Sequence, residues 1–424
     1  MIRLSGADLV LPDRVLGGAT LVVDGDKIAA ILAAADGAGD LRPEDDLRPE
    51  GPSYLSFSFE NHYVVPGFID VHVHGVEGTD TLDGGAAIAD IAGKLTRYGV
   101  TAFCPTSIAC DPAALARMLA GVRTARTTRP PGGARVLPAH LESNFINPEY
   151  KGAQPIECLR RPPKSRRSGV AAKAGGGAKA DAEAWTGDDI LVEIAAARPD
   201  VGIVTVAPEI DGVLELIADL AAHGHHVSLG HSGATYEEAM DGIRAGARQA
   251  THLFNRMTPL AHRAPGLAGA VLESDDVVAE LVCDGVHVHP AMMRVALAAK
   301  RPERIMAITD GTAGSGLPPG SHAALGGRRI AVRDAAYLED GTIAGSTLTM
   351  DRAFAKLVSE VGLSLPDAAT VCATTPARAL GLQRFGVLAP GAAADFVVLD
   401  RDLKVVQTWI AGTLAWDLSS KQTV

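Results

Sequence analysis

Two histidines stand one residue apart at the end of an apolar run, in the stretch FIDVHVHG at residues 68–75. Side chains at positions i and i+2 of a strand point to the same side, so the imidazoles of His72 and His74 would face one point in space. Neutral imidazole is a common ligand of divalent metal ions. Two histidines at a strand end are more often ordinary polar loop residues, so the rest of the chain decides between these interpretations.

Histidines and carboxylates recur at the ends of several apolar runs. The residues at or just after a predicted strand end are His72, His74, His140, Glu142, His231, His252 and Asp310. Glu142, His231 and His252 would make a site of two histidines and one carboxylate with positions left open for water, as is typical of catalytic metals. We predict these three as metal ligands, and we expect His72 and His74 to hold a second ion that Glu142 bridges.

Asp310, in the motif ITDG, is suited to a different task. A metal ion lowers the pKa of a bound water towards neutrality. Some group must then accept the proton of that water and deliver it to the leaving nitrogen, and a carboxylate beside the ion suits both steps. We therefore predict Asp310 as the catalytic acid and base. The alternative is an aspartate that caps the following TDGT turn.

Residues this far apart in the sequence meet only if the fold gathers strand ends. From residue 64 onward, short β-branched runs alternate with segments of helical period, the pattern of βα units around a parallel sheet. Eight such units predict a TIM-type (β/α)8 barrel, whose active site lies at the carboxyl ends of its strands. The predicted strands are residues 64–71, 100–106, 135–141, 201–207, 226–230, 248–252, 277–284 and 304–310.

Helix starts and a second domain complete the predicted architecture. Asp111 before Pro112, and Thr235 three residues before Glu238, have the pattern of helix caps. Both ends of the chain alternate like β-strands, and we expect them to meet in one small β-sandwich. The predicted domains are a β-sandwich at residues 1–63 and 381–424 and a catalytic barrel at residues 64–380, with a hairpin at residues 327–345 and a basic Gly/Ala-rich loop at residues 160–185.

Composition limits the classes of function. Aromatic residues make up 4% of the chain and the formal net charge is −11, which disfavours binding of nucleic acid by base stacking or by a basic surface. An anionic substrate would need a local positive site, because the overall field repels it. We find no secretory signal pattern and no long uncharged apolar run, so we expect a cytoplasmic protein without a membrane partner. The loop at residues 160–185 is either simply mobile or a lid over the active site.

Several motifs resemble those of N-acetylglucosamine-6-phosphate deacetylases in the amidohydrolase superfamily, and they occur in the family's order. The motifs are PGFIDVHVHG, GHS at 230–232, THLFNRM at 251–257, APGLAGA at 264–270, DGVHVHP at 284–290, ITDGTAG at 308–314 and AGSTLTMD at 344–351. The resemblance implies a metal-dependent barrel with a β-sandwich from both termini, one or two divalent ions, commonly zinc or iron, and a homodimer. The implied reaction converts N-acetylglucosamine 6-phosphate to glucosamine 6-phosphate and acetate.

The resemblance also assigns individual residues. It places the five predicted metal ligands and Asp310 at the family's metal and acid/base positions. Asn255, Arg263 and His287 match positions that contact the sugar phosphate, and family dimers can supply the arginine from the neighbouring subunit. An arginine offers a planar fork of donors to phosphate oxygens. A protein of net charge −11 needs such a cationic group to bind a phosphate.

Two departures from the family pattern concern the substrate. Ser143 and Asn144 stand where the family usually has Gly-Pro, and Gln154 stands where a KGxH motif supplies a histidine that polarises the substrate carbonyl. Gln154 can still donate a hydrogen bond to substrate through its amide, but it cannot carry charge. The departures leave open the acyl group and the sugar epimer, so N-acetylgalactosamine 6-phosphate or another N-acylated compound is the alternative substrate.

Two other classes are less consistent with the residues. Many cyclic-amide hydrolases of this superfamily bridge two metals with a carboxylated lysine at the end of strand four, whereas this strand ends in VTVAPE without a lysine. A barrel protein that has lost catalysis should lack some of the ligands, and this chain has all five and Asp310. Function is read from the site and not from the fold, so both alternatives are disfavoured.

Overall fold

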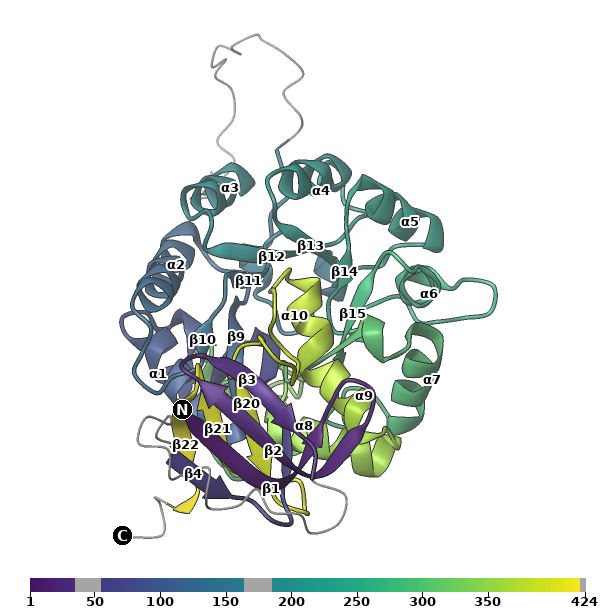
Figure 1. Cartoon of the computed structure of the whole chain (residues 1–424). Coiled ribbons are helices and arrows are strands. Elements are labelled where there is room, and N and C mark those ends of the chain that lie inside the picture. The colour runs from purple at the N-terminus through teal and green to yellow at the C-terminus, as the bar shows by residue number, and fades with distance from the viewer. Residues whose placement is uncertain (35–54, 164–184, 420–424) are drawn as a thin grey trace, which may run out of the picture.

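The computed structural model describes residues 1–34, 55–163 and 185–419, so most of the basic loop predicted at 160–185 lies outside the described residues. Within these ranges, parallel strands form a nearly closed barrel (Figure 1). Two short strands, β10 and β11, share the third position because both pair with β9. The barrel strands are β6 (Phe68–Val73), β9 (Val100–Ser107), β10 (Arg135–Val136), β11 (Ala139–Glu142), β12 (Val201–Val206), β13 (His226–Leu229), β14 (Gln249–Ala250), β15 (Val278–Val282) and β16 (Ile305–Ile308).

Helices surround the barrel in an arc from α1 to α7 (Figure 1). Two predicted helix starts are confirmed: Asp111 accepts a hydrogen bond from the backbone N–H of Ala114 at 2.9 Å, and Thr235 and Glu238 form a reciprocal capping box. The helices are α1 (Ala87–Leu95), α2 (Pro112–Thr127), α3 (Gly187–Ala196), α4 (Val213–Ala222), α5 (Tyr236–Ala245), α6 (Gly266–Glu273), α7 (Pro290–Lys300), α8 (Met350–Lys356), α9 (Leu365–Ala369) and α10 (Thr375–Ala379).

The first predicted strand, residues 64–71, is two strands in the structure, so this prediction was wrong. The chain leaves β5 (Tyr63–Pro66) and enters β6 after Gly67. Gly67 permits a close approach, because a Cβ there would lie 2.3 Å from the side chain of Thr101. β5 pairs with strands outside the barrel and β6 with the barrel strand β9, so at Gly67 the chain passes from the outer sheet into the barrel.

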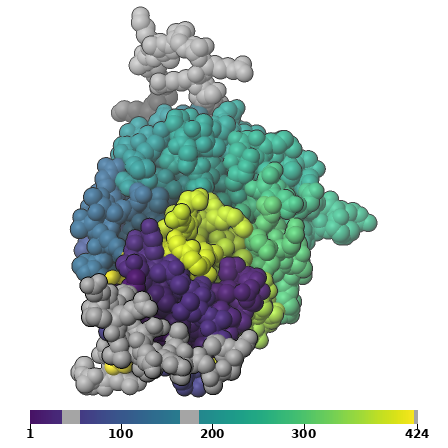
Figure 2. Space-filling view, viewed as in Figure 1, coloured from purple at the N-terminus to yellow at the C-terminus, as the bar shows by residue number. Residues whose placement is uncertain are grey.

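The two ends of the chain combine in one mixed sheet, as expected for a domain built from both termini. Its order is β22-β21-β20-β5-β1-β2-β3, with β4 paired to β1. Figure 2 shows the N-terminal and C-terminal residues side by side on one face of the molecule. Trp409 is buried in its core with Leu4, Leu21 and Phe396. The strands outside the barrel are β1 (Ile2–Val10), β2 (Val15–Asp24), β3 (Lys27–Leu32), β4 (Leu55–Ser58), β5, β20 (Phe396–Leu399), β21 (Val405–Ile410) and β22 (Thr413–Asp417).

Short strands add local structure beside the barrel. β7 (Gly75–Val76) and β8 (Thr79–Asp80) form a small ribbon after β6. The hairpin predicted at residues 327–345 is a three-stranded antiparallel sheet of β17 (His322–Leu325), β18 (Arg328–Val332) and β19 (Ala336–Tyr337). None of the helices in the described ranges combines the length and the apolar character that a membrane span needs.

An apolar cluster closes the barrel at one end. Ala377 of α10 packs among Ile69, Val71 and Met306 of the barrel strands, and Leu380 and Phe385 extend the same cluster. In Figure 1 α10 lies across the middle of the barrel. Because this end is filled with apolar side chains, the polar chemistry of the strand termini is confined to the other end.

An ion pair connects the barrel to the terminal sheet. The guanidinium of Arg135, on β10, donates to both carboxylate oxygens of Asp395 at 2.7 and 3.0 Å. The side chain of Asp395 is 4% exposed, and its carboxylate also accepts from the backbone N–H of Ala411 at 2.7 Å. Bidentate charge-assisted pairs of this kind are the strong ones.

We expect Asp395→Asn to lower the free energy of unfolding by about 2 kcal/mol, because a half-buried guanidinium loses its charged partner. Asp13, whose side chain is 67% exposed in its pair with Arg14, provides the matched control. Asp13→Asn should change stability by less than about 0.5 kcal/mol. Denaturant unfolding of the three proteins measures both effects, and equal losses in the two variants would contradict the role given to Asp395.

Candidate active site

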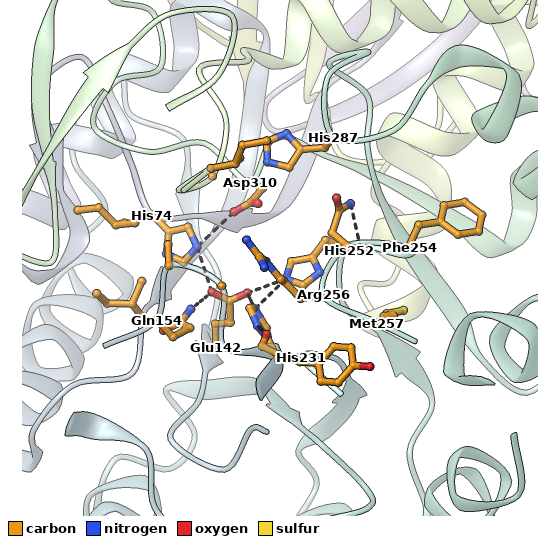
Figure 3. A pocket seen from close by; sticks show the side chains of 18 of the residues that line it. His74, Glu142, Gln154, His231, His252, Phe254, Arg256, Met257, His287 and Asp310 are labelled. Carbon is orange, nitrogen blue, oxygen red and sulfur yellow. Dashed lines mark hydrogen bonds and ion pairs between the residues drawn. The ribbon is translucent and has the colours of Figure 1, made fainter. Parts of the chain in front are cut away.

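A cavity of about 410 Å³ opens at the carboxyl ends of the barrel strands (Figure 3). The strand-end residues predicted from sequence lie in its wall or directly beneath it. Of these, His74, Glu142, His231, His252 and Asp310 are among its lining residues, together with Gln154, Asn255 and His287, which the family resemblance assigned to the substrate.

Glu142, His231 and His252 form the first cluster. Oε1 of Glu142 lies 2.8 Å from Nε2 of His231 and 2.8 Å from Nε2 of His252. The two Nε2 atoms are 3.0 Å apart, and all three side chains are buried. The residues come from β11 and from the segments after β13 and β14, so the barrel brings together side chains separated by up to 110 positions.

The hydrogen bonds around this cluster leave it short of positive charge. Nδ1 of His231 donates to the carbonyl oxygen of Tyr150 at 2.8 Å, so in the neutral ring Nε2 carries a lone pair. That lone pair faces a carboxylate oxygen and a second imidazole nitrogen. Burial opposes ionisation of His252, but the hydrogen bond and charge of Glu142 raise its pKa to about 9. A proton or a divalent cation must therefore lie among these three atoms, and the donor set fits a divalent metal ion.

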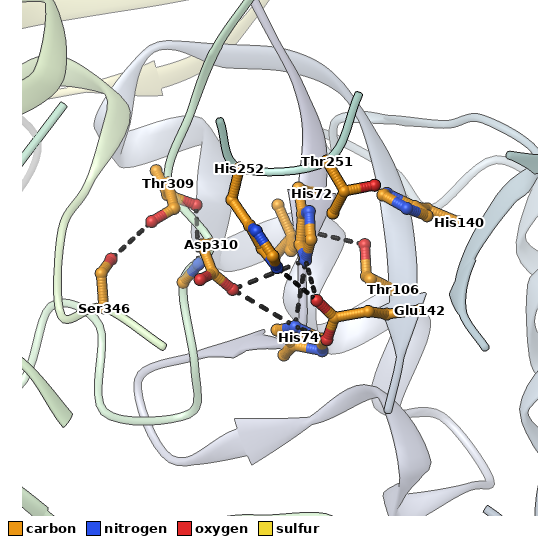
Figure 4. Close-up of polar contacts among 12 residues, drawn as sticks. His72, His74, Thr106, His140, Glu142, Thr251, His252, Thr309, Asp310 and Ser346 are labelled. Atoms are coloured by element: carbon orange, nitrogen blue, oxygen red, sulfur yellow. Dashed lines mark hydrogen bonds and ion pairs between the residues drawn. The ribbon is translucent and has the colours of Figure 1, made fainter. Parts of the chain in front are cut away.

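His72, His74 and Asp310 form a second cluster beside the first (Figure 4). Nε2 of His72 and Nε2 of His74 are 3.2 Å apart, and Oδ1 of Asp310 lies 3.5 Å from the first nitrogen and 3.3 Å from the second. Glu142 lies between the clusters, with its carboxylate oxygens 3.9 Å from His72 and 3.6 Å from His74. The arrangement is consistent with two neighbouring ions that share one carboxylate.

A buried glutamate beneath the site orients His72. Oε2 of Glu280, on β15, lies 2.9 Å from Nδ1 of His72 and accepts a hydrogen bond from it, which leaves the lone pair of Nε2 directed at His74 and Asp310. Burial lowers the pKa of His72 to about 3, so this ring is neutral, and burial raises the pKa of Glu280 to about 7. Glu280 was not predicted from the sequence. The available signal was a single carboxylate inside the apolar run VVAELV.

Strained backbone presents three of these side chains. His231, His252 and Asp310 have φ values of 49°, 32° and 48° in the left-handed region, which costs a non-glycine residue roughly 1 to 3 kcal/mol. Each follows its strand by two residues, where the chain must turn sharply to aim the side chain into the cavity. Asp70 supports the turn at Asp310, because its carboxylate accepts from the hydroxyl of Thr309 at 2.6 Å.

Gln154 is engaged by the protein at both ends of its amide. Its NH₂ group donates to Oε2 of Glu142, and its carbonyl oxygen accepts from the backbone N–H of Ala109 at 2.7 Å. The side chain is buried, and one N–H remains for another partner. The main contact of Gln154 is thus with the carboxylate that lies between the two clusters.

The three residues expected at the phosphate differ in their placement. Asn255 and His287 line the cavity, whereas Arg263 is exposed and is absent from the described lining. Burial opposes ionisation of His287, but its 2.6 Å hydrogen bond to Asp284 and the charge of that carboxylate raise its pKa. Arg256, which the sequence did not single out, lines the cavity instead. Spacing within THLFNRM gave no indication of where the Arg256 side chain would point.

Comparison with known proteins agrees with the geometry. The family described as the Amidohydrolase family matches residues 63–415. An N-acetylglucosamine-6-phosphate deacetylase of Danio rerio is 36% identical over 372 residues, which cover 84% of this chain and 85% of that protein. An N-acetylgalactosamine-6-phosphate deacetylase of Escherichia coli O157:H7 is 34% identical over 352 residues, which cover 82% of this chain and 87% of that protein.

A solved structure matches over nearly the whole chain. It is a mutant N-acetyl-D-glucosamine-6-phosphate deacetylase of Mycobacterium smegmatis in complex with N-acetyl-D-glucosamine-6-phosphate. The TM-score is 0.82 at 31% sequence identity, and the alignment covers 98% of this chain and 99% of that one. The likeness therefore includes both the barrel and the sheet formed by the termini.

We expect the purified protein to contain a tightly bound divalent metal ion, and Glu142→Gln to lose most of it, because this carboxylate faces both clusters. Removal of the ion by a chelator should lower the free energy of unfolding by about 3 kcal/mol if free ion was at roughly 100 times its Kd. Elemental analysis and thermal unfolding measure both quantities. His322→Asn, at an exposed histidine that does not line the cavity, is the control. Full metal content in the Glu142 variant would refute the ligand set.

Proposed function

Because the chain belongs to the N-acetylglucosamine-6-phosphate deacetylase family of the amidohydrolase superfamily, we propose that it hydrolyses the N-acetyl group of N-acetylglucosamine 6-phosphate. The products are glucosamine 6-phosphate and acetate. The observation that carries the proposal is the 2.8 Å approach of Glu142 to both His231 and His252, beside the carboxylate of Asp310. Relatives with this activity match more than four fifths of the chain.

Five residues would hold the metal in this proposal. Glu142, His231 and His252 would hold one ion, and His72 and His74 would hold a second, with Glu142 available to both. An ion held there polarises the substrate carbonyl and acidifies water. The nitrogen and oxygen donors suit zinc or iron, which we propose as the natural metals.

Asp310 is the proposed acid and base. Burial works against its ionisation, but the nearby His72 and the hydrogen bond from His74 keep its pKa below the ordinary value, so it is ionised at neutral pH. An ionised carboxylate in this position accepts a proton from the attacking water as the water oxygen bonds to the acetyl carbon. The carbon–nitrogen bond then breaks, and Asp310 returns that proton to the departing amine nitrogen.

The polar groups at the cavity wall would hold the sugar phosphate. Asn255 supplies an amide, and His287 supplies a cationic imidazole, since Asp284 favours its charged form. Arg263 would reach the phosphate from a neighbouring subunit, which makes a homodimer part of the proposal. The dimer rests on the family resemblance.

Gln154 supports the galacto epimer as a second candidate substrate. It stands where the family has a histidine, and its contact with Glu142 leaves one N–H for a substrate oxygen. A relative of comparable identity acts on N-acetylgalactosamine 6-phosphate, as its name states. The two epimers differ at one hydroxyl, so a single changed hydrogen-bonding group at the cavity wall is enough to alter the preference.

We expect acetate release from at least one 6-phosphorylated epimer to exceed release from the unphosphorylated sugar by about 100-fold in kcat/KM, because a phosphate offers several charge-assisted hydrogen bonds. Initial rates with both phosphorylated epimers and with N-acetylglucosamine measure this ratio and the epimer preference. Equal rates with and without phosphate would remove the phosphate roles given to Asn255, Arg263 and His287.

We expect Asp310→Asn to reduce kcat by about 10² to 10⁴-fold, because the amide cannot accept and return the proton. Metal content should stay close to that of the unchanged protein, which separates loss of proton transfer from loss of the ion. Asp402→Asn, at an exposed carboxylate, serves as the control and should retain full activity. A metal-loaded Asp310 variant with full turnover would rule out the acid and base role.

A further inference from the structure

Arg256 is the cation of the cavity wall that the assignments above leave without a role. Among the described residues that line the cavity it is the only arginine or lysine. Its side chain is exposed to solvent, and Figure 3 shows it directed into the cavity. Its backbone carbonyl accepts from the N–H of Ser232 at 3.0 Å, which anchors the loop while the side chain extends away from it.

The local backbone is built to present this side chain. Arg256 has a φ of 50° and Phe254 a φ of 77°, so with His252 three residues of the segment between β14 and α6 adopt the left-handed conformation. Gly152 provides the opposite surface, because a Cβ there would lie 2.8 Å from Nε of Arg256. The Arg256 side chain thus lies against the backbone of Gly152, where a larger residue would displace it.

An anionic substrate that enters this cavity needs a cation in the wall, because the surrounding charge is negative. Glu142, Glu149 and Asp310 contribute carboxylates to the wall, and the chain carries a formal net charge of −11. A phosphate dianion entering such a cavity needs a cation with several donors, and a guanidinium presents a planar fork to phosphate oxygens. Asn255, the neighbour of Arg256 in sequence, lines the same wall.

We propose that Arg256 binds the 6-phosphate of the substrate from the same subunit that holds the metal cluster, and so determines the preference for phosphorylated sugars. The proposal rests on the proposed function, since it names a contact made by that substrate. It differs from the assignment of Arg263, whose side chain is exposed and is not part of the described cavity wall. With Arg256 in this role, one subunit contains both the metal ligands and a phosphate anchor.

The test replaces Arg256 by Asn, which removes the charge and tolerates a positive φ better than most residues. Arg301→Asn is a closely matched control, because Arg301 is also exposed, has a φ of 59° and lies outside the cavity. We expect Arg256→Asn to lower the ratio of kcat/KM for phosphorylated over unphosphorylated sugar by about 10 to 100-fold, mainly through KM. Arg256→Lys should recover part of the loss, because it restores the charge without the fork.

Three outcomes would overturn the proposal. The first is an unchanged ratio in Arg256→Asn, and the second is an equal loss on both sugars, which would indicate a structural or catalytic role. The third is loss of phosphate preference in Arg263→Asn alone, with Arg256→Asn unaffected. If the unchanged protein releases no acetate from either phosphorylated epimer, the proposed function fails. In that case, calorimetry measures the affinity of inorganic phosphate for the metal-loaded protein and for Arg256→Asn. Equal affinities would show that Arg256 does not bind phosphate.

Discussion

The site depends on one physical constraint, which is that several lone pairs converge on a small buried volume and need positive charge, a proton or a cation, among them. Glu142 faces two imidazole nitrogens at 2.8 Å, and hydrogen bonds to Tyr150 and Glu280 fix the outer nitrogens of His231 and His72 as donors. The inner nitrogens must then accept. Such an arrangement is costly in a low-dielectric interior unless positive charge occupies the centre, so the same contacts that would bind a metal make the empty cluster unfavourable.

One end of the barrel is packed with apolar side chains, and the unfavourable polar groups lie at the other end. Apolar packing of α10 fills one end and includes Met306 and Ile308 of β16, the strand whose other end leads to Asp310. The left-handed backbone at His231, His252 and Asp310 persists only where the surrounding structure over-determines it. Burying a carboxylate such as Glu280 is also unfavourable. It fixes the orientation of His72, because a ring held at Nδ1 directs Nε2 one way.

The sequence predicted the barrel and the convergence of strand-end residues because both follow from periodicity. Apolar runs mark the strands, and parallel strands place their carboxyl ends together, so His74 and Asp310 meet although 236 positions separate them. Periodicity does not report on loops or on residues inside a strand. Glu280 was therefore missed within a buried strand, and Arg256 was missed because its direction depends on two left-handed residues and on the space left by Gly152.

The three residues that depart from the family pattern, Ser143, Asn144 and Gln154, all form hydrogen bonds within the protein. Ser143 donates to the carbonyl of Thr205 at 2.5 Å, and the Asn144 amide donates to the carbonyls of Cys110 and Cys158 at 2.8 and 2.7 Å. Gln154, at the far end of the same segment, donates to Glu142. Where the family pattern has Gly-Pro and histidine, this chain therefore has three side chains that make four hydrogen bonds in and around the loop that follows β11. The Gln154 bond contacts Glu142 directly, and the bonds of Ser143 and Asn144 fix the two residues that follow it. These side chains therefore restrict the orientation of the carboxylate that lies between the two clusters, as outer hydrogen-bond partners do for metal-ligating groups.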